Sequence, residues 1–146
     1  MKRHSLIVLI AVLFSLSASA QLSLTKTWLN QEKDGKVKVF LGTDGKYHGQ
    51  IIWLKEPNEK NGTPKLDKEN PDHEKRKRPV LNLQILHGLE KKSEAEYING
   101  KIYDPKNGKT YDCKMTIIDA KHVNLRGYVL GMPFLGRTSS WTLAED

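Results

Sequence analysis

Four consecutive basic side chains, Lys75, Arg76, Lys77 and Arg78, form the sequence feature with the clearest chemical consequence. A guanidinium group can bind a carboxylate or a phosphate through two parallel hydrogen bonds, so the arginines favour an anionic partner. That partner would be an acidic small molecule or the surface of a cell envelope. The alternative is a solvated loop, because residues 55–79 hold eight basic and six acidic side chains that can pair with one another.

A second group of residues predicts a pocket for a small, partly apolar molecule. Successive side chains of a strand point to opposite faces. On this basis four aromatic residues are expected to point inward: Tyr47, Trp53, Tyr111 and Trp141. Arg137 and Ser139 share the face of Trp141, and Arg78 would stand at the rim beside them, so polar anchors are available. The alternative is that these aromatic side chains simply fill a core.

Residues that would indicate catalysis or metal binding lack the required spacing. No two of the four later histidines are spaced as metal ligands, namely His48, His73, His87 and His122. Three acidic residues lack the glycine and the terminal glutamate of a calcium-binding loop, namely Asp67, Glu69 and Asp72. No nucleophile elbow or glycine-rich phosphate loop is present. The sequence therefore predicts a protein without enzymatic activity, cofactor or metal.

The first twenty residues differ from the rest of the chain. Lys2 and Arg3 precede an apolar run over residues 6–16 and the triplet Ala18-Ser19-Ala20, which is typical of a secretory signal peptide. The run is too short for a transmembrane helix. Cleavage after residue 20 would leave 146 − 20 = 126 residues and lower the formal charge from +7 to +5. We expect a periplasmic or secreted protein, for which nucleic acid is not the expected partner.

The remaining residues, 21–146, predict a single all-β domain. Apolar and polar residues alternate in eight short segments joined mostly by tight turns, at about 28–32, 37–41, 47–53, 81–85, 97–103, 111–117, 123–129 and 137–143. Closing such a meander removes its exposed edges. This favours an eight-stranded antiparallel up-and-down barrel, with a two-sheet sandwich as the alternative. A long loop over residues 55–79 follows the third strand.

Two smaller expectations follow from the same alternation. Cys113 is the only cysteine and shares a face with Met115 and Ile117, so we expect a buried thiol. Gly100 interrupts its segment, so we expect a β-bulge there.

Several sequence blocks resemble domain-of-unknown-function family 2147, whose members are small exported bacterial proteins. The blocks lie at residues 52–57, 70–72, 76–81, 83–89, 100–111, 125–128 and 135–141. The resemblance implies a lipocalin-like barrel and no particular reaction. Lipocalins proper begin with Gly-x-Trp, whereas Lys26 stands two residues before Trp28. By analogy with that superfamily, Arg137 would stack on Trp28 and close the barrel.

These observations lead to one leading hypothesis and one alternative. The leading hypothesis is an exported barrel that binds a small, partly apolar, lipid-like ligand inside, beneath the long loop. Arg78 or Arg137 would contact an acidic group of that ligand. The alternative is a filled barrel that contacts an envelope surface or a protein through its basic loop.

Overall fold

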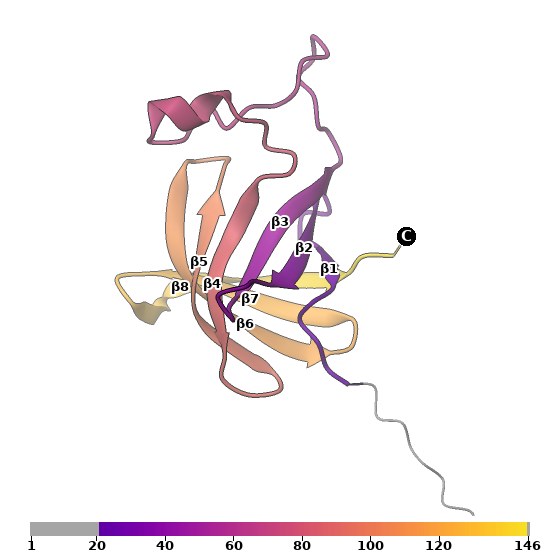
Figure 1. The fold of residues 1–146 in the computed structure, drawn as a ribbon, viewed down its shortest axis with the longest axis vertical. Coiled ribbons are helices and arrows are strands. Elements are labelled where there is room, and N and C mark those ends of the chain that lie inside the picture. Colours follow the sequence, from indigo (N-terminus) through magenta and orange to yellow (C-terminus); the bar gives the residue numbers. More distant parts are fainter. Residues whose placement is uncertain (1–20, 146) are drawn as a thin grey trace, which may run out of the picture.

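The structure, a computed structural model, describes residues 21–145, and the predicted signal peptide at residues 1–20 lies outside the described residues. Eight strands form a closed barrel in which neighbours in the chain are neighbours in space (Figure 1). All pairs are antiparallel, which confirms the predicted up-and-down barrel. The strands are β1 (Thr27–Leu29), β2 (Gly35–Leu41), β3 (Tyr47–Leu54), β4 (Gln84–Lys91), β5 (Glu96–Asp104), β6 (Lys109–Asp119), β7 (His122–Val129) and β8 (Met132–Leu143).

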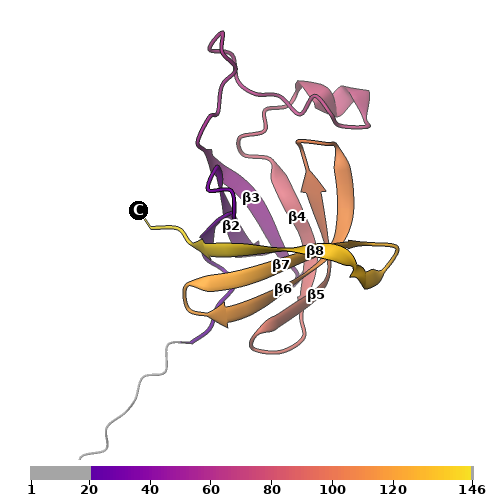
Figure 2. The same ribbon diagram turned by 180° about the vertical axis from the view of Figure 1, so that it is seen from behind.

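The connections between strands lie alternately at the two ends of the barrel. We call the end that carries the long segment between β3 and β4 the loop end, and this segment rises above the barrel in Figure 2. The turns after β1, β5 and β7 belong to the same end, because the strands alternate in direction. Among the described residues, no helix combines the length and the apolar character needed to cross a membrane.

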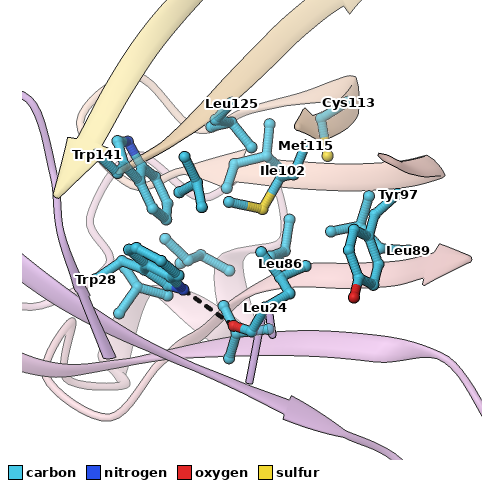
Figure 3. Packing of buried hydrophobic residues seen from close by; sticks show 14 of the residues in the cluster. Leu24, Trp28, Leu86, Leu89, Tyr97, Ile102, Cys113, Met115, Leu125 and Trp141 are labelled. Carbon is cyan, nitrogen blue, oxygen red and sulfur yellow. Dashed lines mark hydrogen bonds between the residues drawn. The ribbon is translucent and has the colours of Figure 1, made fainter. Parts of the chain in front are cut away.

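Apolar side chains from all eight strands fill the space inside the barrel (Figure 3). Trp28 is fully buried, and its indole nitrogen donates a hydrogen bond to the carbonyl oxygen of Leu24 at 3.0 Å (Figure 3). Cys113 is also fully buried and carries a free thiol, as predicted. Because burial disfavours the thiolate, the pKa of Cys113 is raised to about 12.

The β5–β6 pair contains the predicted irregularity. Tyr97 lies opposite Met115 and Gly100 lies opposite Cys113, so β5 has one extra residue between these pairs. A side chain at position 100 would collide with Leu89, since a Cβ atom there would lie 2.6 Å from its Cδ2. Glycine therefore lets β4 and β6 side chains close over the bulge.

The long segment is slightly longer than predicted and contains regular structure of its own. Because β4 begins at Gln84, the connection runs over residues 55–83. It contains one 3-10 helix, η1 (His73–Lys77), and two isolated antiparallel bridges, Asn58 with Pro64 and Leu66 with Pro79. The second bridge brings the two halves of the segment together beside the barrel.

Candidate functional site

Three predicted site residues form a column on the inner face of β8. The β7 residues opposite them are Val123 (opposite Trp141), Leu125 (opposite Ser139) and Gly127 (opposite Arg137). These β7 residues belong to the inward face of the barrel. Trp141 is buried, and its indole nitrogen donates to the hydroxyl of Ser139 at 3.0 Å. Ser139 is half-buried and Arg137 is exposed. The column therefore runs from the core to solvent.

The column opens to solvent because β8 is much longer than its partner β1. Only Thr142 and Leu143 of β8 pair with β1. Within residues 21–145, the preceding part of β8 pairs with β7 on one side and with no strand on the other. The edge is partly capped where the backbone N–H of Ser140 donates to Gln31 Oε1 at 2.9 Å. We call this stretch, residues 132–139, the free edge of β8.

The predicted stacking of Arg137 on Trp28 is wrong. Trp28 lies opposite Leu143, six residues along β8 from Arg137, which corresponds to about 20 Å. The cation near the indole is instead Lys26, whose Nζ lies 5.9 Å from the ring centroid. Arg137 is therefore not used to close the barrel. Within residues 21–145 its side chain has neither a hydrogen bond nor an ion pair.

A glycine lies beside Arg137 on the inner face. Its cross-strand neighbour is Gly127, and a Cβ atom built at Gly127 would find its nearest neighbours at 3.8 Å (Tyr111 Cβ) and 3.9 Å (Ile102 Cγ2). These are ordinary contact distances, so glycine is not needed here to avoid a clash. Arg137, Tyr111 and Ile102 thus lie next to Gly127, where the barrel wall carries no side chain, and Ser139 lies two residues along β8 from Arg137. We call these five residues the Arg137 site.

The predicted inward position of Trp53 is wrong because β3 contains a bulge. Val37 lies opposite Ile51 and Lys36 lies opposite Trp53, so Ile52 is an extra residue on β3. The extra residue shifts the alternation by one, and Trp53 points outward with Lys36. The Nζ atom of Lys36 lies 5.3 Å from the centroid of the Trp53 ring, and the indole is 39% exposed.

Tyr47 and Tyr111 face inward but do not meet. Tyr47 begins β3 at the end opposite the loop end, where its ring packs edge-on against Tyr97 at a centroid distance of 4.9 Å. Tyr111 belongs to the loop end, where its hydroxyl accepts a hydrogen bond from Asn107 Nδ2 at 3.0 Å. Of the predicted aromatic residues, Tyr111 lies nearest Arg137, while Trp141 lies four residues along β8 at the buried end of the column.

Two hollows among residues 21–145 lie on the outer surface, one lined by Leu29 and Leu143 and the other by Phe40 and His48. Neither is lined by the buried core residues of β5, β6 and β7. The inner face meets solvent where the column opens, at the Arg137 site.

Histidines on the outer face of β3 and β4 have structural partners. His48 Nε2 lies 3.0 Å from Asp44 Oδ2, and His48 Nδ1 accepts a hydrogen bond from the backbone N–H of Gly88 at 3.3 Å. Both ring nitrogens of His48 are thus used to hold the β2–β3 turn against β4. The described chain contains no group of three His, Cys, Asp or Glu side chains arranged to hold a metal ion.

A buried carboxylate anchors the long segment to the barrel. Asp67 is fully buried, and its Oδ1 accepts a hydrogen bond from the hydroxyl of Tyr103 at 2.5 Å. Its Oδ2 accepts hydrogen bonds from Asn70 Nδ2 at 2.8 Å and from Arg78 Nε at 3.0 Å. Burial and the bond to Asp67 raise the pKa of Tyr103 to about 12. We call Asp67, Asn70, Arg78 and Tyr103 the Asp67 anchor.

The Asp67 anchor lies on the outer face of the β5–β6 hairpin. Ile102 and Tyr111 are opposite each other on the inward face, so the next pair, Tyr103 and Thr110, faces outward. Tyr103 is nevertheless only 8% exposed because the long segment covers it. The segment is thus attached to the outside of the barrel wall, and its closing over the interior stays a prediction.

The basic run is mostly engaged within its own segment. Arg78 binds Asp67, Arg76 Nε donates to the carbonyl oxygen of Asn70 at 2.6 Å, and Lys75 Nζ lies 3.7 Å from Asp72. The contacts explain why a run of four cations is tolerated in one place. They also leave Arg78 with a structural partner in the position where a ligand was predicted.

Comparisons with known proteins agree with this architecture. A family model described as "Uncharacterized protein conserved in bacteria (DUF2147)" matches residues 26–143. The chain belongs to the DUF2147 family. A solved structure described as "Protein HP1028 from the human pathogen Helicobacter pylori belongs to the lipocalin family" is similar to it with a TM-score of 0.76 and 24% identity. The similarity covers 86% of this chain and 85% of that chain. Comparison with curated proteins gave no match.

The DUF2147 chain therefore has a lipocalin-like barrel. An eight-stranded barrel has an interior just wide enough for packed side chains or for one small ligand, so the fold suits small-ligand binding in general.

In this DUF2147 protein, sequence reasoning missed Asp67 and Tyr103 as partners. One signal was available, because Leu66 is the only Leu, Ile, Val or Phe in residues 55–79 and indicates where that segment meets the barrel.

The DUF2147 chain offers a direct test of the contact between the long segment and the β5–β6 turn. Gly108 has φ +73°, and a Cβ atom there would lie 1.9 Å from the carbonyl oxygen of Glu69. Gly108→Ala is therefore expected to displace the segment and to make it cleavable by trypsin at least tenfold faster. Gly62→Ala is the matched control, because Gly62 has φ +85° but no atom within 4 Å. Each substitution costs about 1 kcal/mol of backbone strain. Equal cleavage rates for the two variants would contradict the contact.

Proposed function

We propose that this DUF2147 protein is exported and binds a small, partly apolar anionic ligand at the Arg137 site. The observation that carries the proposal is Arg137 itself, an arginine on the inward face of β8 that reaches solvent without an ion-pair partner among residues 21–145. An arginine in this position is suited to bind a carboxylate or phosphate through two hydrogen bonds. The lipocalin-like barrel supports the choice of a small ligand.

The neighbours of Arg137 support a ligand that is apolar next to its acidic group. Gly127 leaves the wall bare, while Tyr111 and Ile102 border that position with apolar surface. Ser139 provides a hydroxyl between Arg137 and the buried Trp141. A chain or ring placed over Gly127 would remove this surface from water, which contributes roughly 25 cal/mol per Å² before the costs of association. The combination suits a fatty acid or an alkyl phosphate.

Binding of palmitate and dodecyl phosphate, followed by tryptophan fluorescence and native mass spectrometry, tests the proposal. Arg137→Gln is expected to weaken binding by roughly ten- to a hundredfold, because a hydrogen bond to a charged group contributes about 1.5–3 kcal/mol. Gly127→Val should also weaken it, since the new side chain would occupy the bare position. Lys38→Gln, which removes an exposed cation from the outer face of β2, is the control. Unchanged affinity in Arg137→Gln would refute the proposal.

The alternative function, a surface contact through the basic run, has weaker support. Arg76, Arg78 and Lys75 already have partners within their own segment, so a new anion would compete with existing hydrogen bonds. Within residues 21–145, Lys77 alone of the four has neither a side-chain hydrogen bond nor an ion pair. A surface contact of this kind would weaken steeply with salt.

Export is proposed from residues 1–20 and is tested by the N-terminal sequence of protein recovered from the periplasm.

A further inference from the structure

The turn between β7 and β8 carries the largest group of exposed apolar side chains in the described chain. Five large apolar residues are exposed within seven positions, namely Val129, Leu130, Met132, Phe134 and Leu135. The turn projects beyond the barrel wall, at the left of Figure 1 and at the right of Figure 2. Contiguous exposed apolar groups of this kind indicate an interaction surface, whereas scattered ones do not. We call residues 129–135 the apolar tip.

The backbone of the apolar tip favours a residue other than leucine at position 130. Val129 lies opposite Met132, so Leu130 and Gly131 form a two-residue hairpin loop. Their φ angles are +56° and +66°, which is the left-handed conformation that asparagine and glycine adopt most easily. Leu130 is strained there, yet its side chain is 78% exposed and so contributes little packing. A leucine at this position therefore adds little to the packing of the described residues.

The second apolar element of the tip is a short excursion of β8. Tyr128 lies opposite Gly136 and Val129 lies opposite Met132, so residues 133–135 have no partners on β7. Phe134, in the middle of this excursion, is 76% exposed. The excursion is fixed in place, because Arg126 Nε donates to the carbonyl oxygen of Pro133 at 2.7 Å. On the other side of the turn, the N–H of Gly131 donates to Asp112 Oδ2 at 3.1 Å.

The charges around the tip select the kind of surface that it fits. Residues 120–144 contain no aspartate or glutamate. Arg126 and Arg137 flank the tip on β7 and β8, and Lys114 lies opposite Arg126 on β6. The nearby Asp112 is already paired with Lys101. An apolar tip surrounded by cations matches the acyl-chain boundary and the anionic headgroups of a lipid bilayer. A second copy of the chain would bring the same cations together.

We propose that the apolar tip inserts into the interface of a bilayer that contains anionic lipids and holds the protein at that surface. Leu130 and Phe134 enter the acyl-chain boundary, and Arg126, Arg137 and Lys114 meet the headgroups. The proposal does not depend on the proposed ligand. The two proposals share Arg137, and every other side chain in the membrane contact is different. If both hold, docking brings the Arg137 site to the membrane surface.

Flotation with lipid vesicles tests the proposal on processed protein purified from the periplasm. Vesicles of phosphatidylcholine with phosphatidylglycerol are expected to bind the protein at least tenfold more strongly than vesicles of phosphatidylcholine alone. Leu130→Asn and Phe134→Asn are each expected to reduce binding about tenfold, since each removes a large apolar side chain from the contact. Leu41→Asn is the matched control, because Leu41 is 56% exposed at the opposite end of the barrel.

Leu130→Asn has a second expected effect that a purely structural role would not produce. Asparagine suits the left-handed backbone, so the melting temperature should rise by a few degrees while vesicle binding falls. Absence of binding by the unmodified protein, or equal binding by Leu130→Asn, would overturn the proposal. A concentration-dependent dimer that disappears in Leu130→Asn, without vesicle binding, would also overturn it and identify a second copy as the partner. Palmitate binding in solution reports separately on the proposed ligand.

Discussion

As the pH rises from 9 to beyond 12, the free energy of unfolding is expected to fall by about 7 kcal/mol. The fall has two main sources, because the pKa values of Cys113 and Tyr103 are both raised to about 12 in the folded chain. Burial is the first cause in each case, and at Tyr103 the bond to Asp67 adds to it. One pKa unit corresponds to about 1.4 kcal/mol, so Cys113 accounts for about 4 kcal/mol and Tyr103 for about 3 kcal/mol.

The direction follows from which state holds the proton more tightly. A folded-state pKa above the unfolded value gives stability that is complete below the unfolded pKa, about 9 for cysteine and 10 for tyrosine. This stability is lost as the pH rises through the folded-state pKa. Burial also raises the pKa values of Tyr97 and Tyr128, which act in the same direction. Alkaline unfolding near pH 12 is the expected outcome, since typical total stabilities are about 5–15 kcal/mol.

Urea unfolding at several pH values, followed by tryptophan fluorescence, checks this prediction. Cys113→Ala should lower stability at pH 7 and flatten the curve between pH 9 and 12, because the titrating thiol is gone. Val123→Ala is the control, since it empties part of the core without removing a titrating group. It should shift the whole curve downward in parallel. Equal slopes in the Cys113→Ala and unmodified proteins would contradict the assigned role of Cys113.

Replacing Asp67 with alanine is expected to lower the free energy of unfolding by about 3 kcal/mol and to release the long segment. The carboxylate is fully buried and accepts hydrogen bonds from three side chains, those of Tyr103, Asn70 and Arg78. Its removal leaves the hydroxyl of Tyr103 and the amide of Asn70 buried without this partner, which costs about 1–3 kcal/mol for each group. Arg78 is half-exposed and can bind water instead.

Chemical unfolding and limited trypsin digestion check the Asp67 prediction together. The segment contains eight lysine and arginine residues, so its release should give rapid cleavage before the barrel unfolds. Glu59→Ala is the matched control, because Glu59 pairs with Lys68 at the exposed surface of the same segment, and its loss should leave the stability nearly unchanged. Arg78→Gln should cost less than Asp67→Ala. A resistant segment in Asp67→Ala would show that other contacts hold it.

Most of the fold was predictable because each strand carries its own signal. The period-two alternation, the turns at Gly45 and Gly108 and the bulge at Gly100 depend on neighbouring residues only. The buried position of Cys113 follows from the same local pattern. The prediction for Trp53 failed since one extra residue, Ile52, reverses the faces of everything that follows it in β3. No local signal marks that residue.

For the site residues too, local geometry was predictable from the sequence, whereas contacts between distant residues were not. Sequence alone determined that Arg137, Ser139 and Trp141 share one face of a strand, because this needs only the geometry of an extended chain. It also determined the all-β class and the presence of a long polar segment after β3. Only the tertiary structure decided which of those residues reach solvent, since that depends on how far β8 extends past the short β1. It likewise decided that Arg78 binds Asp67 and that Tyr103 is covered, because these contacts join residues 11 and 36 positions apart in the chain.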